Sequence, residues 1–361
     1  MPSREELEFL ALLVHRGKLT HEQAGEAMRE AQSAQARLDS TLIRLGWFTR
    51  EKLEELRKND GEDLPDVPGH IVIERIGIGG TARVYRARER QSSRDLGGRE
   101  AGGREVALKI LNPELALDAL ARERFIAEGR LLCDLDHPSI VKGYRVAHFT
   151  PRSGGDPVYL LSMELVKGKT LLEHLHAKQS FDEDTALAAV LAAARGLDYL
   201  RSRGIVHRDI KPGNLMIGEG GVVKLIDLGF AQSSAAETAA SAPADTTVGT
   251  VHYLSPEQAR GEGDLDVRSD IYSLGVTLFH LVVGELPFQG EAPSEVIRKH
   301  VLEGLSSPAL KGRRISPHVH YFIEKMMAKE REIRYGSPSE LIRDIERTTA
   351  GKKSADFKPR R

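Results

Sequence analysis

One eight-residue segment limits the possible folds of this chain more than any other feature, and it reads His207-Arg208-Asp209-Ile210-Lys211-Pro212-Gly213-Asn214. Because Pro212 and Gly213 prevent a helix from continuing, the segment must form a loop. The loop presents the carboxylate of Asp209, the ammonium group of Lys211 and the amide of Asn214 together. One such residue is readily explained by structure alone, whereas eight in this order favour a functional site.

A further acidic residue lies close behind this loop. Twelve residues separate Asn214 from Asp227, which follows the apolar segment 222–226 and precedes Leu228 and Gly229. A carboxylate at the end of an apolar strand is a natural ligand for a hard cation. Its spacing from Asn214 makes Asp227 a strong candidate for that role.

A glycine-rich segment, 77–84, lies between two strand candidates. Gly77, Gly79 and Gly80 let backbone amides approach phosphate oxygens closely. The strand–turn–strand context argues against a Rossmann or Walker site, because in those sites a helix follows the glycines. Taken alone, this run does not identify a nucleotide site.

A lysine and a glutamate form the next candidate pair. Alternation in the apolar segment 106–111 puts Lys109 beside Ala107 on one strand face. In the following helix Glu128 shares an apolar stripe with Phe125, Leu132 and Leu135. A carboxylate placed there costs on the order of several kcal/mol unless it is paired. We therefore hypothesise an ion pair between Lys109 and Glu128.

Together these motifs resemble the eukaryotic-type protein kinase family, in its bacterial serine/threonine branch, over about residues 70–350. The resemblance implies an α+β fold, with a small β-rich lobe and a large helical lobe. It implies ATP and Mg²⁺ as cofactors and protein hydroxyl groups as acceptors. Asp209 would accept or orient the hydroxyl proton and Lys211 would steady the γ-phosphate. Lys109, positioned by Glu128, would hold the α- and β-phosphates, and Asn214 and Asp227 would bind magnesium.

The same resemblance implies an adenine site and several structural contacts. Adenine would lie among Val84, Ala107 and Met216, with Met163 as gatekeeper and the backbone of Glu164 and Val166 as hydrogen-bond partners. Glu257 should pair with Arg334, and Asp270 should anchor the catalytic loop. Ala82, Leu228 and Tyr335 depart from the usual glycine, phenylalanine and proline, and none of these changes removes a catalytic group.

Control by phosphorylation is expected from Arg208. An arginine beside the catalytic aspartate can pair with a phosphate on the activation loop and order that loop. The candidate hydroxyls are Thr246 and Thr247, and Thr250 resembles the position that favours serine/threonine over tyrosine acceptors.

Residues 1–62 contain an internal repeat in which segment 13–22 matches segment 42–51 at an offset of 29 residues. Each copy predicts a helix, a glycine stop, a threonine N-cap (Thr20 or Thr49) and a new helix. The repeat predicts a compact helical module. It resembles the N-terminal module of type II secretion and pilus-assembly ATPases, where related modules can bind a cyclic dinucleotide. The first copy lacks the Arg-Leu-Gly opening of such binders, so we expect docking or dimerisation instead.

The predicted organisation is therefore a helical repeat module at 1–62, a linker at 63–70, a kinase domain at 71–350 and a basic tail at 351–361. Within the kinase domain the small lobe spans 71–163 and the large lobe 167–350. The glycine-rich stretch 88–105 is expected to be an insertion in a strand hairpin.

Composition bears on partners and location. A net charge of −1 gives no general attraction to nucleic acid. The N-terminal residues lack the layout of a signal peptide, no apolar run is long enough to span a membrane, and a single cysteine excludes an internal disulfide. We expect a cytoplasmic protein.

Two rival functions remain at this point. A pseudokinase scaffold would keep the fold without turnover, although every catalytic position is intact. A small-molecule kinase would lack the segments Gly249-Thr250 and Ser255-Pro256-Glu257, which resemble a substrate-docking region.

Overall fold

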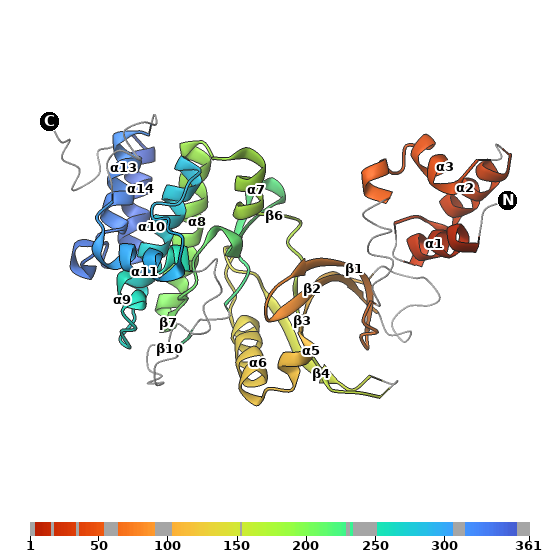
Figure 1. Ribbon diagram of the computed structural model, residues 1–361, viewed down its shortest axis with the longest axis horizontal. Coiled ribbons are helices and arrows are strands. Elements are labelled where there is room, and N and C mark those ends of the chain that lie inside the picture. Colours follow the sequence, from red (N-terminus) through yellow and green to blue (C-terminus); the bar gives the residue numbers. More distant parts are fainter. Residues whose placement is uncertain are drawn as a thin grey trace. The chain divides into compact units, whose positions relative to one another are not determined.

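The computed structural model describes residues 4–15, 18–33, 36–53, 64–90, 103–151, 154–228, 232–233, 251–305 and 315–351 (Figure 1). The chain divides into two compact units. The first comprises Met1–Ile126 and Tyr144–Leu165, and the second comprises Ala127–Gly143 and Val166–Arg361. We describe each unit by itself.

The first unit begins with the helices α1 (Arg4–His15), α2 (His21–Ser33) and α3 (Leu38–Arg44). The expected threonine caps are present in both copies of the repeat. The Thr20 hydroxyl accepts a hydrogen bond from the backbone N–H of Gln23 (3.1 Å), and Thr49 accepts one from Lys52 (3.2 Å). Gly46, at the end of the second copy's first helix, has φ 74°, a conformation that favours glycine. The threonine caps are thus alike in the two copies, while Gly17, the expected helix stop of the first copy, lies outside the described residues.

The core of this helical module uses equivalent positions of the two copies. Leu13 and Leu42 are 29 residues apart, and both are completely buried. Glu6 is also buried, and its carboxylate accepts a hydrogen bond from the backbone N–H of Leu38 at the start of α3 (3.1 Å). The module contacts the sheet through Lys18, whose Nζ lies 3.0 Å from Oε1 of Glu74.

A five-stranded antiparallel sheet follows, in the order β1-β2-β3-β5-β4. The strands are β1 (His70–Ile78), β2 (Ala82–Glu89), β3 (Glu105–Leu111), β4 (Gly143–Phe149) and β5 (Val158–Glu164). Val106, Leu108 and Ile110 of β3 lie in one buried cluster, as the alternation predicts. The short helix α5 (Pro113–Ala116) and the long helix α6 (Ala119–Asp134) come after β3.

Two expectations about the connections of this sheet can be compared with the structure. The segment assigned to the linker includes Val67, which is 1% exposed and packs in the sheet core, so that part of it belongs to the folded lobe. The hairpin between β2 and β3 is confirmed, because Arg88 pairs with Glu105. The centre of its insertion, 91–102, lies outside the described residues.

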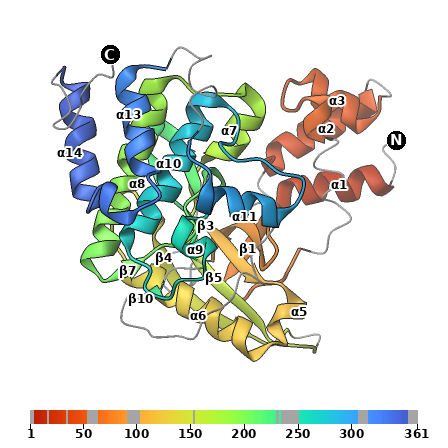
Figure 2. The same ribbon diagram turned by 60° about the vertical axis from the view of Figure 1, so that its left-hand side comes forward.

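The second unit is mainly helical. Its helices are α7 (Leu171–Lys178), α8 (Glu183–Ser202), α9 (Pro256–Ala259), α10 (Val267–Val283), α11 (Pro293–Leu302), α13 (Pro317–Met326) and α14 (Pro338–Thr349). Almost every residue of α10 is buried, and α10 packs against α8 and α13 (Figure 2). Leu187, Val190, Ala194, Leu197 and Leu200 of α8 are buried and recur at the spacing of one helix face.

Short strands in this unit carry the site. They are β6 (Gly168–Thr170), β7 (Ile205–Val206), β8 (Leu215–Gly218), β9 (Val223–Leu225) and β10 (Gln232–Ser233). β6, β8 and β9 form one sheet, and β7 pairs with β10. The loop between β7 and β8 is the motif segment 207–214.

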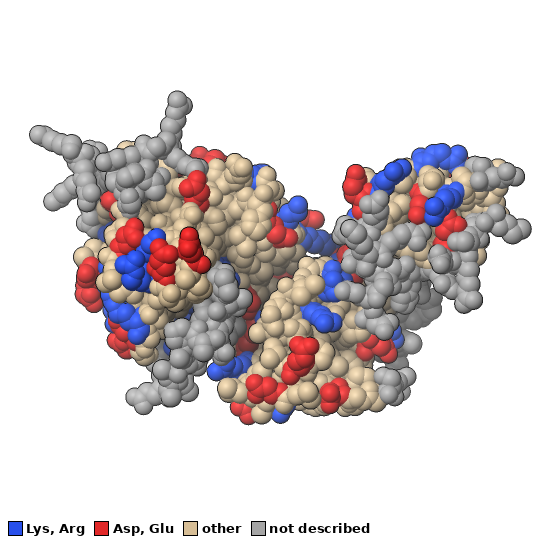
Figure 3. All heavy atoms as spheres, viewed as in Figure 1, with Lys and Arg blue, Asp and Glu red and all other residues tan. Residues whose placement is uncertain are grey.

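Charge and hydropathy on the described surface agree with the composition. Acidic and basic side chains are interspersed on the visible face rather than gathered by sign (Figure 3). Among the described helices, none is both long and apolar enough to cross a bilayer.

Candidate active site

One buried carboxylate holds the backbone of the motif loop, residues 207–214. Asp270, in α10, is 1% exposed and accepts hydrogen bonds from the backbone N–H groups of His207 (2.9 Å) and Arg208 (2.7 Å). Burial raises the pKa of Asp270 to about 7, and the two N–H donors act in the opposite direction. Bonds from two successive amides fix the course of the backbone here. The predicted anchoring of the loop by Asp270 is confirmed.

Arg208 adopts an unusual conformation in this loop. Its φ is 68°, a region that side-chain-bearing residues rarely enter and that costs on the order of 1–3 kcal/mol. Both of its backbone groups are bonded, because its N–H donates to Asp270 and its carbonyl accepts from Nε2 of Gln258 at 2.8 Å. These bonds hold the turn that directs the next residue, Asp209.

Asp209 is 7% exposed, and its two carboxylate oxygens differ. Oδ2 lies 2.9 Å from Nζ of Lys211 and accepts a hydrogen bond from Nδ2 of Asn214 at 2.8 Å. Oδ1 is buried and has no hydrogen-bond partner within the part of the chain that the structure describes. A buried carboxylate oxygen without a donor costs free energy, so it is a good candidate acceptor for a ligand's proton.

Asn214 and Asp227 are brought together by the hairpin of β8 and β9. Leu215 pairs with Leu225, and the backbone N–H of Ile226 donates to the carbonyl of Asn214 at 3.1 Å. Nδ2 of Asn214 also donates to the Asp209 carbonyl at 2.9 Å, so the amide nitrogen faces Asp209 and the amide oxygen is the end suited to a cation.

This donor set fits magnesium. The described residues contain no group of three or more His, Cys, Asp or Glu side chains that could enclose an ion. Mg²⁺ is commonly held by one or two protein oxygens together with phosphates and waters. One amide oxygen and one carboxylate, from Asn214 and Asp227, match that requirement.

His207 is a structural member of the loop. Its side chain is fully buried, and burial lowers its pKa below the ordinary value for histidine. Its Nδ1 lies 3.3 Å from the backbone nitrogen of Asp209, which donates to it. A neutral ring that accepts a backbone N–H supports the loop without adding charge.

In the first unit, one sheet face carries the residues expected to contact a nucleotide. Gly77 pairs with Val84, and Val84 pairs with Lys109, so the three form a row across β1, β2 and β3. Paired residues of antiparallel strands share a face. Ala107 belongs to the same face and pairs with Met163 of β5.

The glycine-rich turn between β1 and β2 is fastened by a residue that the motif does not include. Nδ2 of Asn112 donates to the carbonyl of Gly80 at 2.9 Å, and the Asn112 backbone N–H donates to Thr81 at 2.9 Å. A Cβ built on Gly80 would meet no atom within 4 Å, so this turn is open. Asn112 directly follows β3, but no pattern in the sequence identifies its partner.

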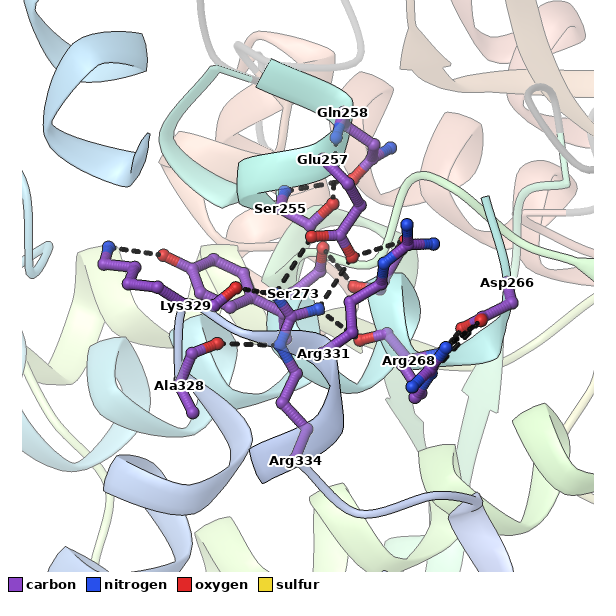
Figure 4. A network of polar contacts seen from close by, with 12 residues as sticks. Ser255, Glu257, Gln258, Asp266, Arg268, Ser273, Ala328, Lys329, Arg331 and Arg334 are labelled. Carbon is purple, nitrogen blue, oxygen red and sulfur yellow. Dashed lines mark hydrogen bonds and ion pairs between the residues drawn. The ribbon is translucent and has the colours of Figure 1, made fainter. Parts of the chain in front are cut away.

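The predicted pair of Glu257 and Arg334 is confirmed and lies inside a larger network (Figure 4). Two hydrogen bonds, of 2.7 and 2.9 Å, join the guanidinium to the carboxylate, and both side chains are at most 1% exposed. Arg334 also donates to the carbonyls of Ala328, Arg268 and Lys329. Burial alone would raise the pKa of Glu257, but the bonds and charge of Arg334 hold it below the ordinary value.

The other candidate residues are divided between the two units. Lys109 is 8% exposed in β3, Glu128 is partly buried in α6, and Glu164 ends β5. The structure therefore assembles Asp209, Lys211, Asn214 and Asp227 in one unit and Gly77, Val84, Ala107 and Lys109 in the other. Val166 and Met216 belong to the unit that holds Asp209. Thr246, Thr247 and Thr250 lie outside the described residues.

Comparison with known proteins now identifies the class. The sequence model of the protein kinase domain matches residues 70–344. The serine/threonine-protein kinase PknB of Mycobacterium leprae is 36% identical over 276 residues, which cover 76% of this chain and 42% of that kinase. PknB of Mycobacterium tuberculosis (strain H37Rv) is 34% identical over 276 residues, with the same shares. A probable PknB of Bifidobacterium longum is 36% identical over 273 residues, covering 75% and 38%.

The chain belongs to the protein kinase family. The relatives named above are bacterial serine/threonine-protein kinases. The expected α+β kinase fold, with a five-stranded antiparallel lobe, a helical lobe and helices before the kinase domain, is confirmed. The chain spans less than half the length of the curated relatives named above. Residues 1–62 lie outside the matched region, so their resemblance to an ATPase module stays a prediction.

Proposed function

We propose that this protein is an ATP- and magnesium-dependent serine/threonine kinase that transfers the γ-phosphate to hydroxyl groups of proteins. One observation supports this most strongly. Asp209 is buried with one oxygen bonded by Lys211 and Asn214, while the other has no hydrogen-bond donor among the described residues. Such a carboxylate is oriented by its neighbours and ready to accept a hydroxyl proton.

Each residue of the loop has a part in the proposed reaction. The Oδ1 atom of Asp209 accepts a hydrogen bond from the acceptor hydroxyl and aligns its oxygen for attack. Lys211 lies beside the same carboxylate and provides a positive charge where the transferred phosphoryl group carries negative charge. Asn214 and Asp227 would hold Mg²⁺, which neutralises phosphate charge when bound.

The nucleotide is proposed to bind through the other candidates. Gly77, Gly79 and Gly80 offer backbone amides to phosphate oxygens. Lys109 is proposed to hold the α- and β-phosphates in an ion pair with Glu128. The adenine contacts are proposed to come from Val84, Ala107 and Met216, with backbone bonds at Glu164 and Val166.

The accessory parts of the function are proposals of the same kind. Arg208 is proposed to bind a phosphate on Thr246 or Thr247, which would order the activation loop. The helical module 1–62 is proposed to dock a partner or a second copy, since its core is complete without the kinase domain. A location in the cytoplasm is proposed from the single cysteine, which suits a reducing compartment.

The decisive experiment incubates the purified protein with labelled ATP, Mg²⁺ and a generic basic protein. The Asp209→Asn variant should lose incorporation of label at least roughly a hundredfold, while keeping its affinity for ATP. Asp184→Asn is the matched control, because Asp184 is exposed in the first turn of α8. Equal incorporation by wild type and Asp209→Asn contradicts the proposal. ATP binding without any turnover would favour the pseudokinase scaffold instead.

A further inference from the structure

A chain of polar contacts inside the helical unit includes the buried side chains of His300 and Tyr272. His300 of α11 is completely buried, and each of its ring nitrogens has a partner. Nδ1 lies 3.0 Å from the hydroxyl of Tyr272, and Nε2 lies 3.0 Å from the backbone carbonyl of His252. The Tyr272 hydroxyl is in turn 3.3 Å from Nζ of Lys329. The chain therefore has four members, which come from four different segments.

The direction of every hydrogen bond in this chain follows from its two ends. The His252 carbonyl can only accept, so Nε2 of His300 must carry the proton. The ammonium group of Lys329 can only donate, so the Tyr272 oxygen accepts from it. Tyr272 then donates to Nδ1 of His300. Burial lowers the pKa of His300 to about 3, in agreement with a neutral ring that has one donor and one acceptor.

Packing leaves the imidazole little freedom to turn. The ring of Phe288 meets that of His300 edge to face, with centroids 4.9 Å apart. Nζ of Lys329 lies 4.4 Å from the centre of the Phe288 ring. Lys329 also donates to the His300 carbonyl at 2.7 Å, which ties it to the end of α11. The bonds of its two nitrogens and the contact with Phe288 therefore hold the His300 ring in one orientation.

The backbone around His252, at which this chain of contacts ends, is held at further points. The Tyr253 hydroxyl lies 2.7 Å from Nδ1 of His280, and Glu257 is bonded to Arg334. Gln258, one residue beyond Glu257, donates to the carbonyl of Arg208, the residue before Asp209. Segment 251–257 therefore ends against the catalytic loop. Because Gln258 bonds to the residue before Asp209, a peptide whose hydroxyl reached Asp209 would have this segment as a neighbour.

We propose that His300 is a positioning residue for the protein acceptor. Through its Nε2–H it holds the His252 carbonyl, and with it the backbone on which the acceptor peptide lies. Tyr272 and Lys329 fix the tautomer that makes this bond available. The inference rests on the proposed kinase activity for its functional part, whereas the bond itself is testable without turnover.

The tautomer is tested first, on the full-length protein labelled with ¹⁵N at histidine. Nuclear magnetic resonance should show the His300 ring neutral and protonated at Nε2 between pH 8 and about 5. In Tyr272→Phe the tautomer preference should weaken, because the donor to Nδ1 is gone. A ring protonated at Nδ1 alone, or a charged ring at pH 7, overturns the assignment.

The positioning role is tested with His300→Gln and His300→Leu. Glutamine has an N–H and a carbonyl with which it can replace both bonds, while leucine replaces neither. In His300→Leu, amide hydrogen exchange of residues 251–254 should be faster by roughly tenfold, and in His300→Gln it should stay near wild type. Equal exchange in the two variants contradicts the proposal. Tyr272→Phe gives a milder change of the same sign should the leucine variant fold poorly.

Steady-state kinetics distinguish positioning of the acceptor by His300 from a general contribution of this residue to folding. His300→Leu should raise the KM for an acceptor peptide by roughly tenfold and leave the KM for ATP unchanged. The control is His320→Leu, since His320 in α13 is partly exposed and its Nε2 lies 3.7 Å from Oε1 of Glu324, beyond hydrogen-bond distance. Parallel changes in both KM values indicate a merely structural role and refute the inference. A wild type without any turnover refutes the proposed kinase activity alone, and hydrogen exchange then decides the role of His300.

Discussion

The catalytic loop, residues 207–214, and the glycine-rich turn between β1 and β2 are both proposed to act on a nucleotide, yet they are held in different ways. In the loop, buried Asp270 binds two backbone amides and Gln258 binds the intervening carbonyl. In the turn, the exposed side chain of Asn112 reaches the carbonyl of Gly80. The difference indicates that the loop carrying Asp209 is held rigidly, whereas the glycine-rich turn is left able to open. The predictions below test that contrast.

The largest effect is expected at the buried ion pair that supports the catalytic side. Arg334→Met leaves the Glu257 carboxylate buried without its cation, which should lower the free energy of unfolding by about 3–5 kcal/mol. Urea unfolding measures this change. The double variant Glu257→Leu, Arg334→Met should recover much of the loss, because no lone charge remains buried. A double variant as unstable as the single one would show that packing, not charge, dominates here.

Asp270→Asn should weaken the catalytic loop directly. An amide NH₂ would face one of the backbone N–H groups of His207 and Arg208, so that only one donor keeps an acceptor. Since Arg208 has an unfavourable φ, the loop should relax and kcat should fall roughly a hundredfold, with a smaller effect on the KM for ATP. Steady-state kinetics provide the measurement. An unchanged kcat would mean that the loop keeps its course without this anchor.

Two histidines of the helical unit, the buried His300 and the partly buried His280, should each contribute a loss of stability in acid. The pKa of His300 is lowered to about 3 and that of His280 to about 4, in both cases mainly by burial. At each of these two rings the folded state therefore binds fewer protons than the unfolded state below pH 6.5. Their contribution to the free energy of unfolding is lost as pH falls through that value. At pH 5 each histidine should cost about 2 kcal/mol relative to pH 8.

Unfolding curves from pH 8 to 5 check this acid effect. In His300→Gln the acid slope should be reduced by about the share of one histidine. Identical slopes in wild type and His300→Gln would contradict the assignment of His300 as a neutral buried ring.

The smallest effect is expected at the glycine-rich turn. Asn112→Ala removes the side-chain bond to Gly80 from an exposed position, so the KM for ATP should rise only about threefold, with no clear change in stability. Asn112→Asp is the companion variant, because a carboxylate of similar size cannot donate to a carbonyl. If either variant lowered kcat as strongly as Asp270→Asn, the two regions would be equally rigid and the contrast would fail.

Local patterns were sufficient to predict much of the fold and to propose the candidate site. The alternation in 106–111 predicted the strand and its faces, and the threonine caps predicted the start of helices in both copies of the repeat. The motif spacing identified Asp209, Asn214 and Asp227 as one group. These features depend on neighbours in the sequence, whose geometry is set by the chain itself.

Other features became visible only in the tertiary structure. The roles of Asn112 and His300 depend on carbonyls 32 and 48 residues away, and no local pattern reveals such partners. The packing of Val67 into the sheet core likewise could not be read from a segment rich in proline and glycine.

By itself, the sequence determined which chemical groups this protein carries and on which elements they stand, because helix and strand periods and turn residues act over a few positions. The tertiary structure decided which backbone groups those side chains hold. The bond between Asp270 and His207 joins residues 63 apart, and that between Arg334 and Glu257 joins residues 77 apart. A buried charge or an unfavourable φ is tolerated only when a partner compensates for it, and folding alone brings such distant partners together.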